Sequence, residues 1–75
     1  MKKEISIDNL EQRLQFDIRL QIALRINAIR IMENSSTPDR FRQYIRDRES
    51  KLKILLNIDD MENVEVTYKG KRIFP

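Results

Sequence analysis

The sequence contains no cysteine and no histidine, and it has only one glycine. Without cysteine and histidine, the chain cannot form disulfide bonds, zinc sites of the usual kind, or catalytic groups built on a thiol or an imidazole. A single glycine is too few for a glycine-rich loop that binds phosphate groups. We therefore expect a protein that is not an enzyme and that has no cofactor, no metal site and no catalytic residues.

Long hydrophobic runs are lacking as well. The longest unbroken apolar runs are three residues, at 22–24 and 54–56, whereas a transmembrane helix needs about 20 apolar residues. The first ten residues, MKKEISIDNL, lack the apolar segment of a secretory signal peptide. Together with the absence of cysteine, these features predict a cytoplasmic protein that makes no membrane contact.

The length of 75 residues predicts a single domain that spans residues 1–75. A domain of this size buries only about 60% of the surface that its unfolded chain exposes, so its core is marginal. Small domains gain stability from disulfides, from a bound metal or from a partner chain, and this composition leaves only the last of these. We therefore predict a homo-oligomer, namely a dimer.

The segment 13–28, RLQFDIRLQIALRINA, has an apolar residue at every even-numbered position. A period of two is typical of a half-buried strand, but a strand of this length would extend about 53 Å, far more than so small a domain holds. No glycine or proline interrupts the segment to allow a hairpin, and its Leu, Gln, Arg and Ala residues favour a helix. We therefore predict a helix over about residues 8–34.

On a helix, the apolar residues of this segment cover two neighbouring faces, an arc wider than the stripe of about 100° on an ordinary surface helix. A second helix can cover one of these faces, and a chain this short has little else to cover the other. We therefore predict that the second face forms an oligomer interface, made by Phe16, Leu20, Leu24 and Ile31.

Cap residues mark the start of two helices. Asp8, with Glu11 three residues later, fits the N-cap of the first helix. Thr37 and Pro38 fit the N-cap and the first position of a second helix, over about residues 38–58. The short connection predicts that the two helices lie antiparallel as a hairpin.

One charged residue interrupts the apolar seam of the second helix. Arg48 occupies a position where the spacing of Phe41, Ile45, Leu52 and Leu55 calls for an apolar residue, and the first helix carries Asp17 within its apolar arc. A buried charge is costly unless it is paired. We therefore predict an ion pair between Arg48 and Asp17 across the helical hairpin.

The end of the chain has the pattern of a β-hairpin over about residues 63–74. Apolar and polar residues alternate before Lys69 and Gly70, which suit a two-residue turn. Residues 2–7 also alternate and predict a short strand that can join the hairpin. The predicted fold class is α+β and mainly helical: a long antiparallel helical hairpin followed by a C-terminal β-hairpin.

The apolar second face of the first helix and the open edge of the terminal hairpin suggest a function in protein binding. We predict a small non-enzymatic protein-interaction module, a homodimeric regulator or inhibitor that binds another protein, of the kind that phage or accessory genomes encode.

The alternative is a DNA- or RNA-binding regulator, because the net charge is +3 and the isoelectric point is near 9.5. A helix surface that carries charges of both signs is also typical of an ordinary solvated face. The candidate nucleic-acid contacts on the second helix are Arg40, Arg42, Arg46 and Lys53. Basic residues near the termini that can join them are Lys2, Lys3, Lys69, Lys71 and Arg72.

Overall fold

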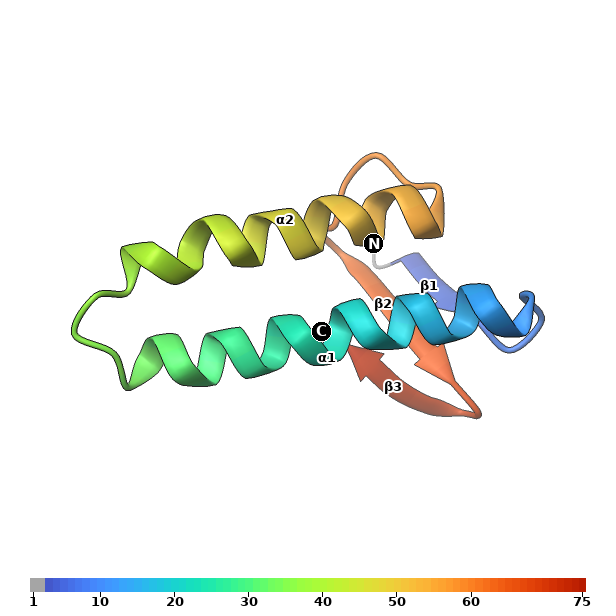
Figure 1. The fold of residues 1–75 in the computed structure, drawn as a ribbon. Helices are drawn as coiled ribbons and strands as arrows, with labels where there is room; N and C mark the ends of the chain where they lie inside the picture. Colours follow the sequence, from blue (N-terminus) through green and yellow to red (C-terminus); the bar gives the residue numbers. More distant parts are fainter. Residues whose placement is uncertain (1–2) are drawn as a thin grey trace.

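The fold comes from a computed structural model that describes residues 3–75, and it is α+β (Figure 1). Lys2, which the sequence places in the first strand and among the basic candidates, lies outside the described residues. The elements in chain order are β1 (Lys3–Ser6), α1 (Gln12–Glu33), α2 (Asp39–Leu56), β2 (Val64–Tyr68) and β3 (Lys71–Phe74). The predicted N-terminal strand, antiparallel helical hairpin and C-terminal β-hairpin are therefore confirmed.

Helix α1 contains the whole alternating segment 13–28, so the prediction of a helix in place of a strand is confirmed. The buried residues of α1 follow the helical repeat: they are Ile18, Gln21, Ile22 and Ala28. Two consecutive positions in a helix differ by about 100° around the axis, so residues two apart differ by about 200°. Alternation that would bury one face of a strand therefore gives this helix apolar residues on opposite sides.

The predicted N-cap of the first helix is wrong. Helix α1 begins at Gln12, and Glu11 at the N-cap makes no side-chain capping hydrogen bond. The carboxylate of Asp8 instead accepts a 2.7 Å hydrogen bond from the backbone N–H of Lys69 in the terminal hairpin. The amide Nε2 of Gln15 donates to the carbonyl of Asp8, at 2.9 Å, and thereby holds the connection between β1 and α1. A contact across 61 residues has displaced the local capping pattern.

The predicted cap of the second helix is wrong as well, although the helix starts within one residue of the predicted position. Helix α2 begins at Asp39, and Pro38 occupies the N-cap without a side-chain hydrogen bond. The backbone N–H of Thr37 donates to the hydroxyl of Ser35, at 3.0 Å, and the two hydroxyls lie 3.3 Å apart. The hydroxyl of Thr37 therefore stabilises the turn between the helices and does not cap α2.

Helix α2 ends two residues before the predicted boundary at residue 58. Asn57 adopts a left-handed conformation, with φ of 56°. The N–H of Ile58 donates to the carbonyl of Lys53, and the N–H of Asn57 donates to the carbonyl of Ile54. These two hydrogen bonds form the Schellman arrangement that closes many helices, and asparagine tolerates the left-handed position better than most residues.

The three strands form one sheet in the order β1-β2-β3. Strand β1 pairs with β2 in parallel, and Ile5 lies opposite Val66. Strand β2 pairs with β3 in antiparallel fashion through the predicted two-residue turn, where Lys69 and Gly70 have φ of 52° and 75°. Positive φ at both positions is characteristic of the type I′ turn, whose twist matches that of the two strands.

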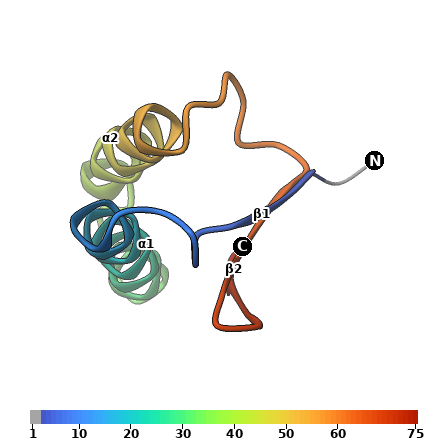
Figure 2. The same ribbon diagram turned by 90° about the vertical axis from the view of Figure 1, so that its right-hand side faces the viewer.

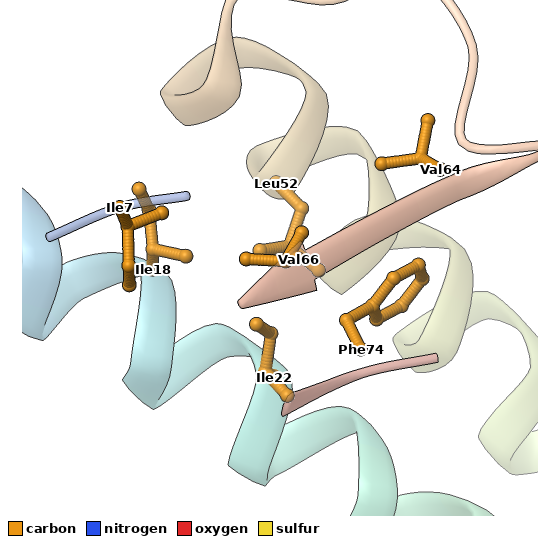
Figure 3. Close-up of a cluster of buried hydrophobic side chains, with 7 residues drawn as sticks. All are labelled: Ile7, Ile18, Ile22, Leu52, Val64, Val66 and Phe74. Atoms are coloured by element: carbon orange, nitrogen blue, oxygen red, sulfur yellow. The ribbon is translucent and has the colours of Figure 1, made fainter. Parts of the chain in front are cut away.

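Both helices pack on the same face of the sheet, as the view along the helices shows (Figure 2). The side chains that fill the space between the layers come from every part of the chain (Figure 3). The buried core consists of Ile7, Ile18, Ile22, Leu52, Val64, Val66 and Phe74. The expectation that little besides the second helix covers α1 is therefore wrong, because the sheet covers a second side of it.

The sheet is too short to cover the helices along their whole length. Helix α1 has 22 residues and extends about 33 Å, whereas strands of four or five residues extend roughly 17 Å at most. The end of the helical pair that contains the connection between α1 and α2 therefore projects beyond the sheet (Figure 1).

Candidate interaction surface

Six large hydrophobic side chains between residues 3 and 75 are exposed. By helical geometry, five of them, all but Ile26, lie on the side of the helical pair away from the buried residues Ile18, Ile22 and Leu52. We call this surface the outer face and define it by its apolar residues, which are Phe16, Leu20, Leu24 and Ile31 from α1 and Tyr44, Ile54 and Leu55 from α2. An exposed apolar surface of this kind is a candidate interaction site.

The contribution of α1 to the outer face follows from the alternation in its sequence. Ile18 and Ile22 are buried in the core under the sheet. Leu20 and Leu24 come two residues later, and they point to the opposite side because two positions rotate by about 200°. Phe16 lies one turn before Leu20, with 57% of its surface exposed. The predicted interface residues of α1 therefore share one face; Leu24 is half-buried and Ile31 is 54% exposed.

Two hollows along the outer face show how the two helices contribute to it. The larger has a volume of about 530 Å³. Its lining consists of Leu24, Asn27, Ala28, Ile31, Arg40, Phe41 and Tyr44. The smaller has a volume of about 380 Å³ and is lined by Asp17, Gln21, Lys51, Ile54 and Leu55. The outer face thus combines apolar side chains with charged residues of both signs, since Arg40 lines the larger hollow and Asp17 and Lys51 line the smaller.

The part of the outer face on α2 was not predicted from the sequence. Ile54 is 78% exposed and Tyr44 is 39% exposed. A signal for Ile54 was present in the run Ile54, Leu55 and Leu56, because three consecutive residues of a helix span about 200° and cannot all face one core. The most exposed of these apolar residues therefore had to point away from the seam with α1.

The predicted ion pair between Arg48 and Asp17 is wrong. Nη1 of Arg48 donates a 3.0 Å hydrogen bond to Oε1 of Gln21, a residue that is 8% exposed. The guanidinium of Arg48 also lies 4.9 Å from the centre of the Tyr44 ring. Asp17 lies 3.7 Å from Arg13, one turn earlier on its own helix. Asp17 is more than a third exposed, so water and a neighbouring arginine satisfy it without a buried partner.

A third hollow lies on the other side of α2, beside the sheet, with a volume of about 610 Å³. Arg25 lies at its edge, where Nε is 3.6 Å from the carboxylate of Glu49 and Cζ is 5.0 Å from the centre of the Phe74 ring. Arg46 and Lys53 line the same hollow. Its acidic lining residues, Glu49, Asp60 and Glu62, balance these cations.

The structure does not bring the four candidate nucleic-acid contacts onto one face. Arg40 lines the larger hollow of the outer face, whereas Arg46 and Lys53 line the hollow beside the sheet. Arg42 lies 3.4 Å from the carboxylate of Asp39. Acidic residues thus accompany three of the four basic side chains. Phosphate binding relies on clustered cations, and this arrangement offers no continuous row of them.

Across residues 3–75, no group of three or more acidic, histidine or cysteine side chains is close enough to hold a metal ion. Neither of the two helices in this part of the chain is long and apolar enough to cross a membrane. No protein-family model, no curated protein and no solved structure matches this chain.

Proposed function

We propose that this protein is a small, cytoplasmic, non-enzymatic interaction module that acts as a homodimeric regulator or inhibitor by binding another protein. The outer face supports the homodimer, and the edge strands of the sheet, β1 and β3, support binding of a second protein. Apolar side chains from two helices line hollows on the outer face together with a few charged residues, and protein interfaces combine apolar and polar groups in this way.

The size of the domain supports association as well. The chain has no disulfide, and its buried core is limited to a few side chains between one sheet and two helices. Large side chains that remain in water on the outer face contribute no burial to the folded monomer. Covering them with another chain adds stability that so small a core does not supply by itself.

The alternative, a regulator that binds DNA or RNA, is less well supported, because the basic residues of α2 lie on different sides of the helix and beside acidic ones. Dimerisation would double the number of basic residues without bringing those of one chain together. Binding to nucleic acid would weaken steeply as salt is added, which distinguishes this alternative from binding to a protein.

The mass of the protein in solution and its retained partners test the proposal. We expect light scattering after size exclusion to give twice the mass of the 9.1 kDa chain. We expect capture from the lysate of its native host to retain the same protein with and without nuclease treatment, and we expect no retention on heparin or on duplex DNA. A stable monomer at every concentration, or a partner that is lost on nuclease treatment, would contradict the proposal.

A further inference from the structure

We propose that the outer face is covered by a second copy of this chain in one defined orientation. In this dimer, α1 of each protomer lies along α2 of its partner, the two-fold axis runs parallel to the helices, and the sheets lie on the outside. The inference rests on the homodimer of the proposed function and specifies its geometry.

The accessible surface of the chain supports a second copy as the occupant. A folded monomer of 9.1 kDa is expected to expose about 4,900 Å². The chain exposes 5722 Å², which is roughly 800 Å² more than that expectation. A standard protein interface buries about 800 Å² on each partner. The elongated chain, with extents of 41 × 26 × 20 Å, therefore leaves about as much additional surface in water as one partner buries in a standard interface.

The orientation follows from which residues of the two helices lie at the same position along the helix axis, which we call their height. The helices are antiparallel (Figure 1), and Gln21 meets Arg48 across them. Asp17 shares a hollow with Lys51 and Ile54, and Leu24 shares one with Tyr44. By the same progression, Phe16 lies at the height of Ile54.

A two-fold axis parallel to the helices keeps each residue at its height and exchanges α1 with α2 across the interface. It places Phe16 opposite Ile54 of the partner subunit, at the outer margins of the two helices. These two are the most exposed hydrophobic residues of the outer face. The same operation places Leu24 near Tyr44 of the partner subunit, so that these two apolar residues meet.

Charges agree with this orientation. The same axis brings Asp17 opposite Lys51 of the partner subunit, and these two side chains have opposite charges. In the other symmetric arrangement, the axis runs across the helices and α1 packs on α1. If this axis passed through the middle of the apolar residues of α1, the arrangement would bring Arg40 near Lys51 of the partner subunit. Like charges placed together in an interface oppose association, and that arrangement would also leave Ile54 in water.

The resulting four helices form a bundle in which every neighbour is antiparallel. Each α1 lies between its own α2 and that of the partner, and adjacent antiparallel helices are the common arrangement in four-helix bundles. Their dipoles oppose one another, which is the favourable orientation.

A pair of charge reversals tests the orientation. Asp17→Lys and Lys51→Asp each create two like-charged contacts in a dimer of identical chains. We expect each variant alone to raise the dimer Kd about tenfold or more. Mixing the two variants restores opposite charges at both contacts, so the mixture should form a heterodimer with the wild-type Kd. Contacts within each chain do not change on mixing, so the rescue reports only on contacts between chains.

Disulfide cross-linking gives an independent test, because the chain has no cysteine of its own. We expect Phe16→Cys mixed with Ile54→Cys, the two chains carrying tags of different size, to cross-link several-fold more than either variant alone. Ile26→Cys, which lies off the outer face, is the matched control and should not cross-link with Ile54→Cys. Efficient cross-linking of Ala23→Cys to itself would instead indicate the arrangement with α1 on α1.

The two tests separate this inference from the proposed function. A wild-type dimer that shows neither rescue on mixing nor the Phe16→Cys to Ile54→Cys cross-link overturns the orientation and leaves the homodimer standing. A wild-type protein that is monomeric at all concentrations overturns both. Dimerisation with both results in the expected direction supports the arrangement.

Discussion

Nη1 of Arg48 donates a 3.0 Å hydrogen bond to Oε1 of Gln21, and this contact joins α1 to α2. Gln21 is the only buried polar residue between residues 3 and 75. Removing one partner of a buried polar contact is costly, because the other partner has lost its water and has no group left to bind.

Removal of either partner should therefore destabilise the protein. We expect Gln21→Leu to lower the free energy of unfolding by about 1–3 kcal/mol, since the guanidinium of Arg48 loses its acceptor. The double variant Gln21→Leu with Arg48→Leu should recover much of this loss, because two apolar side chains suit the seam. Urea unfolding followed by circular dichroism measures both values. Strictly additive effects would show that the two residues do not interact.

The contact between Asp8 and the hairpin turn should also contribute to the stability of the fold. We expect Asp8→Ala to lower the free energy of unfolding by about 1 kcal/mol, because the N–H of Lys69 then loses its side-chain acceptor. Asp8→Asn keeps an acceptor oxygen and serves as the matched control, with a smaller loss. Thermal unfolding of the three proteins tests this order; equal losses for Ala and Asn would show that the contact contributes little.

The turn between β2 and β3 gives a prediction about backbone conformation. Gly70 has φ of 75°, and a Cβ added there would meet nothing within 4 Å. We expect Gly70→Ala to cost about 1 kcal/mol from backbone strain alone, and Gly70→Asn to cost less because asparagine tolerates positive φ. The measurement is the midpoint of chemical unfolding. If alanine costs no more than asparagine, the turn has another conformation in solution.

Ile18 has no exposed surface and lies at the centre of the core. We expect Ile18→Ala to lower the free energy of unfolding by about 2–5 kcal/mol, enough to unfold much of so small a domain, and Ile18→Val to lower it by about 0.5–1.5 kcal/mol. Arg30→Lys, at an exposed position of the same helix, should change it by less than about 0.5 kcal/mol. Circular dichroism during urea titration distinguishes the three. A similar loss for all of them would contradict the assignment of the core.

Association through the outer face predicts that thermal stability depends on protein concentration. The Tm of the wild type should rise with protein concentration, because only folded chains associate with one another and the dimer thereby stabilises the folded state. Ile54→Glu should remove this dependence, since Ile54 is 78% exposed and plays no part in the core. Ile26→Glu, at the exposed hydrophobic residue that lies off the outer face, should retain it. Differential scanning calorimetry over a range of concentrations makes the comparison.

The candidate surface was predicted on α1 and missed on α2. Phe16, Leu20, Leu24 and Ile31 could be identified because the alternating segment places too many apolar residues around one helix. The contribution of Tyr44 and Ile54 depends on how α2 is rotated against α1, and the amphipathic pattern of α2 alone does not fix this rotation closely enough.

The sequence by itself determined the elements whose causes are local. Helical propensity and length made 13–28 a helix, and Lys69 with Gly70 set the turn of the hairpin. Only the tertiary structure decided that Asp8 binds the hairpin and that Arg48 binds Gln21, because each depends on residues far apart in the chain. The same holds for the parallel pairing of β1 with β2 and for the apolar side of α1 that stays outside. In each case several residues of similar chemistry could have formed the contact. The residue that forms it is the one that lies close enough in the folded chain, and the spacing in the sequence does not give that distance.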